Sequence, residues 1–234
     1  MRDFTLVNCD TDSIAIAKKD GSIFGQEENE FLIKELNSLF PELINWEDDG
    51  MFETVLIIRA KNYVLYDGKK VVIKGSGLKA TTKEPALREM VKRMINSLLE
   101  LSQEKIEDIY LEYVKEAYKI QDIKRWGAKK SVTETMMKGE DTSSRKKRAS
   151  IIGKGLEVGD KFFVYFTEDE SLKTIEDFDG KYHVDKMLEK VYKTGFMFQT
   201  VLNMKELCPN YKLKKNKKAL DLLVGNVIVR KQEK

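Results

Sequence analysis

The sequence has very little histidine and cysteine and no long hydrophobic run. Its 234 residues include one histidine, His183, and two cysteines, Cys9 and Cys208, which stand far apart and outside any CxxC context. A zinc site needs several such ligands at close spacing, so none is expected. Two unpaired thiols are typical of a reducing compartment. Because the chain also lacks a run of about 18 apolar residues and a secretory signal, we expect a cytoplasmic protein without a membrane-spanning segment.

Neither sign of charge dominates the composition. The 42 lysine and arginine residues against 39 aspartate and glutamate residues give a net charge of +3, although 35% of the residues are charged. Such a small balance does not by itself indicate a nucleic-acid partner, so the distribution of charge along the chain matters more. With 41% hydrophobic residues, the chain is long enough for one large or two small domains with a buried core.

Two carboxylates stand one residue apart between two strand-like runs. An apolar run that starts at Phe4 leads into the first carboxylate, and an alternating run over 13–17 follows. Both contain β-branched residues and predict strands, so Asp-Thr-Asp-Ser predicts a tight turn between them. Carboxylates this close repel each other unless a cation neutralises them, and Mg²⁺ is commonly held by one or two carboxylates plus substrate phosphates. Asp10 and Asp12 are therefore candidate metal ligands and catalytic residues. The alternative is that both are ordinary turn residues.

The remaining patterns predict an α+β fold. Apolar periodicity indicates an amphipathic helix over 27–40 and strands over 52–60, 62–66 and 70–74, and we expect these strands to join the carboxylate hairpin in one antiparallel sheet with the helix behind it. The second half is expected to be mainly helical, with helices over 85–101, 104–117 and 182–202 and one strand over 162–166. His183 is expected to have a structural role.

Lysines accompany the strands at two places. Lys61-Asn62-Tyr63 lies at the join of two predicted strands, where a lysine suits a phosphate and a tyrosine offers a flat ring with a hydroxyl for the sugar-phosphate backbone. Lys74 and Lys79 flank a glycine-containing stretch in which the backbone can approach a phosphate closely. The alternatives are an exposed lysine beside a cross-strand aromatic residue, and a simple hairpin exit loop.

The clearest basic segment is 124–154, which holds ten lysine or arginine residues against three acidic ones. A mobile basic segment suits the DNA backbone. The candidates for this contact are Arg125, Lys129, Lys130, Arg145 and Lys147. The alternatives are a solvated charge run and a targeting-like cluster at 145–148.

Asp10-Thr11-Asp12-Ser13 resembles motif C of family B DNA polymerases, whose usual form is Tyr-Gly-Asp-Thr-Asp-Ser, with Asn8-Cys9 here in place of Tyr-Gly. Lys61-Asn62-Tyr63 resembles the Lys-x-Tyr motif with which that family holds the primer terminus, and the stretch from Lys74 to Lys79 resembles its Lys-Gly stretch. The chain is thus similar to the C-terminal part of a phage- or archaeal-like family B polymerase. The resemblance implies an antiparallel palm-type sheet with helices over 1–82, followed by a mainly helical, duplex-binding thumb over 83–234.

The resemblance also implies an activity and partners. The family adds dNTPs to a primer 3′-OH with two Mg²⁺ ions, and its motif C places the bridging role on Asp12, with Asp10 nearer the periphery. Motif A, the fingers and the exonuclease would lie upstream, so we expect a subunit of a split polymerase, or a truncated product, that is inactive without an N-terminal partner. Primer-template DNA, dNTPs and a sliding clamp are the other expected partners, in the host cytoplasm if a phage encodes the chain. The alternatives are a non-catalytic duplex-DNA-binding accessory module and a DxD-dependent Mg²⁺ phosphatase, whose first Asp would attack phosphorus.

Overall fold

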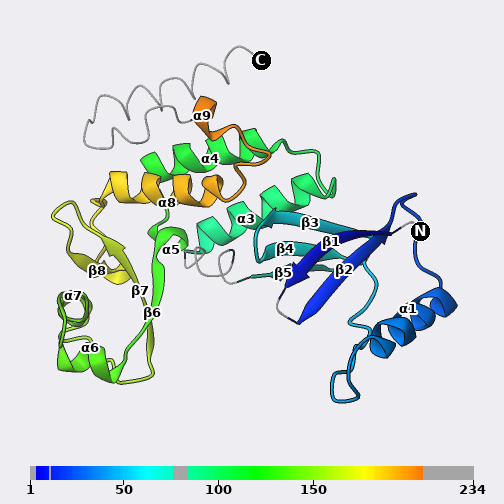
Figure 1. Cartoon of the computed structure of the whole chain (residues 1–234). Helices are drawn as coiled ribbons and strands as arrows, with labels where there is room; N and C mark the ends of the chain where they lie inside the picture. Colours follow the sequence, from blue (N-terminus) through cyan, green and yellow to red (C-terminus); the bar gives the residue numbers. More distant parts are fainter. Residues whose placement is uncertain (1–3, 11, 76–77, 79–83, 208–234) are drawn as a thin grey trace, which may run out of the picture. The chain divides into compact units, whose positions relative to one another are not determined.

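The fold is α+β, with small antiparallel sheets and several helices (Figure 1). The computed structural model describes residues 4–10, 12–75, 78 and 84–207. The chain forms two compact units, Met1–Ser76 and Gly77–Lys234, and each is described by itself. The boundary predicted from the sequence lies a few residues later, at 82.

The first unit contains a hairpin and a three-stranded sheet. Strands β1 (Phe4–Asp10) and β2 (Ser13–Lys18) pair antiparallel, with a bulge between Leu6 and Asn8. Strands β3 (Thr54–Arg59), β4 (Asn62–Tyr66) and β5 (Val71–Lys74) form a separate antiparallel sheet in the order β3-β4-β5. The strand predictions are therefore confirmed to within two residues at each end.

The prediction of one continuous sheet is wrong for the described residues. The hairpin β1-β2 forms a two-stranded sheet of its own, and the three-stranded sheet does not extend to it. Side-chain alternation predicts that a segment is a strand, but backbone hydrogen bonds choose its neighbour. The sequence pattern therefore identified the strands without identifying their pairing across the long connection between β2 and β3.

That connection contains helix α1 (Gln26–Ser38). Gly25 precedes its first turn, where the Glu28 carboxylate accepts a hydrogen bond from the Gly25 N–H at 3.3 Å. The helix buries Leu32, the one position of its apolar stripe that is fully covered. The apolar stripe predicted the helix correctly, but it did not predict how much of the stripe stays exposed to solvent.

Three helices form the core of the second unit. Helices α3 (Pro85–Leu98), α4 (Ile106–Tyr118) and α8 (Val184–Phe196) pack on one another through fully buried methionine and aromatic side chains. Gly195 allows the close approach of α8 to α4, because a Cβ there would lie 2.6 Å from the Tyr110 ring. Arg93 of α3 pairs with Glu112 and Glu104, and these hydrogen bonds raise the pKa of its guanidinium.

A small sheet with two short helices completes the second unit. Short helix α5 (Ile123–Trp126) leads into β6 (Ala128–Ser131), which pairs with β7 (Lys161–Phe166), and β7 pairs with β8 (Leu172–Thr174). Helices α6 (Glu134–Lys138) and α7 (Thr142–Ala149) lie between β6 and β7 in the chain. Their shared core contains Ala128, Val132, Met136, Ile151, Phe162 and Val164. A 3₁₀ turn, η1 (Ile175–Asp177), and helix α9 (Met204–Leu207) follow.

The helix predicted over 182–202 is shorter than expected. It ends at Phe196, and the chain continues in turns that bury Phe198 and Leu202. Apolar spacing alone does not separate a helix from turns that bury their apolar residues against the same core. His183 precedes the helix and accepts a hydrogen bond from the Lys186 N–H at 3.4 Å, a structural capping role as expected.

Candidate functional site

The two aspartates lie at the tip of the β1-β2 hairpin. Asp10 ends β1 opposite Ser13 of β2, so only residues 11 and 12 connect the strands. The Asp10 side chain is partly buried, with 28% of its surface exposed, whereas Asp12 is exposed. No hydrogen bond or ion pair joins the Asp12 carboxylate to another described residue. Asp12 is thus the more available of the two carboxylates for a ligand from solution.

The structure brings Lys61 to this hairpin tip. Its Nζ lies 3.6 Å from Asp10 Oδ1, although about fifty residues separate the two in sequence. Because the Lys61 side chain is 74% exposed, solvent screens the pair and its contribution to stability is small. The contact matters for position, because it places a mobile cation beside the carboxylate turn.

Lys61 occupies an unusual backbone conformation. It lies in the turn between β3 and β4 with φ of 59°, in the left-handed region that glycine or asparagine adopts more easily. The neighbouring strand end supports this turn closely, since a Cβ at Gly75 would lie 2.2 Å from the Lys61 carbonyl oxygen. Gly75 has φ of 102°. Packing therefore explains why a glycine follows Lys74, since a side chain at this position would collide with the Lys61 turn.

Tyr63 and Lys74 share one face of the three-stranded sheet. The register places Tyr63 of β4 directly between Ile57 of β3 and Lys74 of β5, and directly opposite residues point to the same face. Ile57 is 41% exposed, so this face is partly open. An aromatic ring beside a lysine on an open face suits contacts with a sugar-phosphate backbone.

Alternation along a strand does not place Lys61 on the face of Tyr63. That rule holds within a strand, and Lys61 belongs to the preceding turn. The ion pair with Asp10 instead determines where the ammonium group of Lys61 lies. Asn62, the first residue of β4, is buried at 6% exposure and donates a hydrogen bond to the Ala60 carbonyl at 3.0 Å.

The donor set at the turn fits a hard divalent cation. Asp10 and Asp12 offer carboxylate oxygens, the ligand type that Mg²⁺ prefers, and Mg²⁺ is commonly held by one or two carboxylates together with substrate phosphates. In the part of the chain that the structure describes, no group of three or more His, Cys, Asp or Glu residues is placed so that it could hold a metal ion. Binding of Mg²⁺ at the turn stays a prediction.

The basic segment 124–154 is folded rather than a mobile run, since it forms α5, β6, α6 and α7. Within it, Arg125 is held by carboxylates: its Nη2 lies 2.8 Å from Glu89 and its Nη1 lies 3.0 Å from Glu116. Glu116 also accepts a hydrogen bond from the Trp126 indole at 2.9 Å. This network favours a structural role for Arg125 over a DNA contact.

Lys129 and Lys130 point to opposite faces of the small sheet. Both lie on β6, where successive side chains alternate. Lys130 is on the face of Ala128, which belongs to the core, whereas the exposed Lys129 is on the other face beside Phe163. The two lysines therefore cannot contact one phosphate strand in the same way.

Helix α7 carries the densest positive charge of the described residues. Arg145, Arg148 and Lys147 lie on its eight residues, and no ion pair joins either arginine to another described residue. Both arginines are exposed. Arg148 was counted in the basic segment but not chosen as a site residue from the sequence. Lys79, also predicted to contact DNA, lies outside the described residues.

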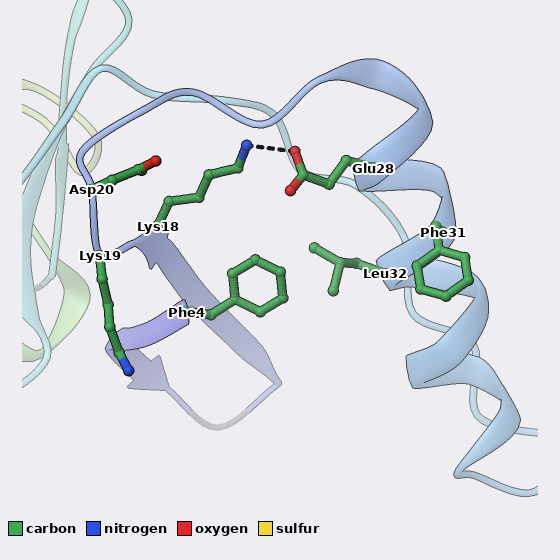
Figure 2. Close-up of a pocket in the computed structure, with 7 residues that line it drawn as sticks. All are labelled: Phe4, Lys18, Lys19, Asp20, Glu28, Phe31 and Leu32. Atoms are coloured by element: carbon green, nitrogen blue, oxygen red, sulfur yellow. Dashed lines mark ion pairs between the residues drawn. The ribbon is translucent and has the colours of Figure 1, made fainter. Parts of the chain in front are cut away.

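A cleft of about 720 Å³ lies at the far end of the hairpin (Figure 2). Phe4, Phe31 and Leu32 line it, and Lys18 and Glu28 form an ion pair of 2.6 Å at its edge. Phe4 is six residues from Asp10 along β1, which corresponds to about 20 Å at about 3.3 Å per residue. The cleft is therefore separate from the carboxylate turn, and sequence reasoning did not anticipate it.

Comparison with known proteins adds no relative to this description. A comparison with protein-family models finds no match, and a comparison with curated proteins finds none either. In the described part of the chain, no helix is both long enough and apolar enough to cross a membrane. The resemblance to a polymerase thus rests on the short motifs and on the way in which the first unit brings two of them together.

Proposed function

We propose that the chain is the palm-and-thumb part of a family B DNA polymerase, which acts in the cytoplasm together with an N-terminal portion that supplies motif A, the fingers and the exonuclease. The observation that carries the proposal is the 3.6 Å contact between Asp10 and Lys61. Each residue belongs to a separate polymerase-like motif, and a chance match of two short motifs does not require them to meet in space.

Asp12 and Asp10 would hold Mg²⁺ at the hairpin tip. The bound ion supplies charge stabilisation for the primer hydroxyl and the triphosphate. Asp12, exposed and without a partner among the described residues, would be the main ligand of this ion, together with a carboxylate of the N-terminal portion. Lys61 partly neutralises Asp10 and lies where a primer phosphate can compete for its ammonium group.

The remaining basic residues would hold the duplex without reading its sequence. Tyr63 and Lys74 contact the primer backbone near its 3′ end from the open face of the β3-β4-β5 sheet. Arg145 and Lys147 on α7 and Lys129 on β6 contact phosphates of the product duplex. A sliding clamp is a further candidate partner of the assembled enzyme.

Primer extension by the reconstituted enzyme tests the proposal. The chain is co-expressed with the product of the reading frame upstream, and the pair is supplied with primer-template, dNTPs and Mg²⁺. Asp12→Asn is expected to reduce extension by at least a thousandfold, because an amide is a poor ligand for a cation that a carboxylate should bridge. Duplex binding by the variant is expected to stay within about twofold of wild type, because no phosphate contact is lost.

Asp108→Asn is the matched control. Asp108 is an exposed aspartate in the first turn of α4, outside the candidate site, and its variant should extend primers normally. If Asp12→Asn turned over at close to the wild-type rate, the turn would not be catalytic.

The second candidate is a non-catalytic module that binds duplex DNA. The observation that favours it is the pair of exposed arginines on α7, Arg145 and Arg148, which have no ion-pair partner among the described residues, since such a surface needs no catalytic centre to bind phosphates. Duplex binding without extension by the reconstituted pair would select it. The phosphatase alternative predicts Mg²⁺-dependent release of phosphate from a small phosphoester by the chain alone, with loss of that activity in Asp10→Asn.

A further inference from the structure

An acidic and apolar surface on the first unit has no role in the proposed chemistry. It consists of α1 and the following segment, residues 26–53, which we call the acidic arm. The acidic arm contains nine aspartate or glutamate residues and one lysine, so it carries a charge of −8 in a chain whose net charge is +3. Such a surface repels nucleic acid.

The acidic arm also exposes large apolar side chains. Leu43 is 97% exposed, Leu39 76% and Phe31 52%. Phe40, Ile44 and Met51 are exposed as well. Large apolar side chains that are exposed together in one segment mark a protein-interaction surface more often than an ordinary solvent face.

The segment after α1 is held in place rather than left as a loose loop. Asn37 of α1 donates to the Trp46 carbonyl at 3.0 Å and accepts from the Trp46 N–H at 2.6 Å. Asn29 donates to Asp48 at 2.6 Å. The apolar side chains of 39–44 are therefore presented in a preformed arrangement, which lowers the entropy cost of docking.

The first unit has a thin core of its own. Among its described residues, the buried hydrophobic side chains are Leu32, Ile58, Val64 and Leu65, whereas the second unit buries many more. The cleft beside α1 continues this apolar character, because Phe31 both lines the cleft and is half exposed (Figure 2). A unit with so little buried apolar surface is typical of a subunit that gains its stability in a permanent complex.

We propose that the acidic arm is the docking surface for the N-terminal polymerase portion, which receives it in an apolar groove rimmed by lysine and arginine. This inference rests on the proposed function for the identity of the partner. Charge complementarity is the reason for the basic rim. The acidic arm carries a charge of −8 beside leucines that the complex would bury, and only lysine and arginine on the partner would offset that charge. A symmetric dimer of this chain through the same surface would place two such charges face to face.

Calorimetric titration of the full chain with the purified product of the upstream reading frame tests the docking surface. The double variant Leu39→Asp/Leu43→Asp is expected to weaken binding by about thirtyfold or more, because exposed apolar anchors carry much of the affinity of an interface. Binding of the wild type is also expected to weaken as salt rises, because the rim is ionic. Circular dichroism should show an unchanged fold, since both leucines are largely exposed.

Ile152→Asp is the matched control. Ile152 is 74% exposed but lies in the second unit, so its variant should bind like the wild type. Equal binding by the double variant and the wild type, or no binding by the wild type, would overturn the docking surface. Self-association of the chain that the double variant abolishes would instead assign the acidic arm to a second copy and would equally overturn it.

Two outcomes separate this inference from the proposed function. If the pair binds through the acidic arm but does not extend primers, the docking surface stands and the polymerase assignment fails. If the pair extends primers and the double variant extends them equally well at limiting protein concentration, the assignment stands and the docking surface fails.

Discussion

Lys61 combines an unfavourable backbone conformation with an exposed charge. A non-glycine residue at φ of 59° costs roughly 1 kcal/mol, and the weak pair with Asp10 does not offset this in solvent. Strained residues of this kind are concentrated at functional sites, where the side chain is needed in a place that the backbone would not choose. Because Glu100 has a similar φ of 57°, the case for a role of the Lys61 ammonium group rests on its position beside Asp10 rather than on the backbone conformation.

Replacing Lys61 by asparagine separates backbone from side chain. Asparagine tolerates the left-handed region, so Lys61→Asn is expected to unfold at the same temperature as the wild type or slightly higher. It should nevertheless raise the primer-template concentration needed for half-maximal extension by about tenfold or more, because a charge-assisted hydrogen bond of roughly 1.5–3 kcal/mol is lost. Steady-state extension with primer and nucleotide varied separately, together with thermal unfolding, measures both effects.

Glu100→Asn supplies the control for this variant. Glu100 has φ of 57° and lies beyond α3, so the substitution relieves a similar backbone conformation away from the candidate site. It should leave extension unchanged. An effect of Lys61→Asn confined to the KM for nucleotide would show that Lys61 serves the other substrate.

The sequence singled out the residues of the candidate site, but not how they are held. Asp10, Asp12 and Lys61 were all selected from short motifs, and the structure places Asp10 and Lys61 in contact. The left-handed turn at Lys61 and the packing of Gly75 on it could not be read from residue types, because backbone conformation at a turn depends on neighbours that are distant in sequence. Arg125 shows the opposite case. The sequence marks it as available for a DNA contact, but in the folded chain it forms ion pairs with Glu89 and Glu116.

At the scale of elements, hydrophobic periodicity located most helices and strands. It succeeded where one face packs against one core, as in α3 and α4. Hydrophobic periodicity missed the elements within 124–154. Helices α6 and α7 are short and polar, and capping side chains rather than an apolar stripe define where they begin. Periodicity also could not show that the β1-β2 hairpin stays separate from the β3-β4-β5 sheet, since alternation carries no information on which strand edge is adjacent.

Helix α7 depends on one such cap. Asp141 accepts hydrogen bonds from the Ser144 N–H and the Ser144 hydroxyl, both at 2.8 Å. These bonds, the backbone one first, hold the pKa of Asp141 below its ordinary value of 3.8. A carboxylate with a lowered pKa in the folded state stabilises the fold above its unfolded pKa, and this contribution is lost as the pH falls through the lowered value.

Asp141→Ala and Asp141→Asn should therefore differ. At neutral pH the alanine variant is expected to melt a few degrees below the wild type, whereas asparagine, itself a good cap, should lie close to it. At about pH 3 or lower, protonation of Asp141 should narrow the gap between wild type and alanine variant. Thermal unfolding by circular dichroism at both pH values measures this, and an equal gap at both would show that the carboxylate charge does not support α7.

For the whole molecule, the small net charge conceals strong segregation. The acidic arm carries −8, whereas the segment 124–154 carries +7 from ten basic and three acidic residues. Composition alone could not indicate a nucleic-acid partner, but the distribution of charge predicts a protein-binding surface on the acidic arm and a phosphate-binding surface on the segment 124–154. The chain should consequently bind duplex DNA weakly, without sequence preference, and with strong dependence on salt.

The salt dependence of binding can distinguish arginines that contact DNA from those that stabilise the fold. Each phosphate contact adds about −0.9 to the slope of log K against log salt concentration. Arg145→Gln/Arg148→Gln should therefore make the slope shallower by up to about 1.8, because both side chains are exposed and free of ion pairs among the described residues. Arg125→Gln should leave the slope unchanged and instead lower the melting temperature, because Glu89 and Glu116 lose their ion pairs with the guanidinium.

Fluorescence anisotropy titrations of labelled duplex at several salt concentrations give these slopes for the wild type and both variants. Each protein is compared on duplexes of two unrelated sequences, since phosphate contacts carry no base information and both duplexes should give the same slope. A slope that changed equally in the two variants would place Arg125 on the DNA despite its carboxylate partners. A wild-type slope near zero would remove the duplex-binding role of α7 altogether, because binding through released counterions cannot be independent of salt.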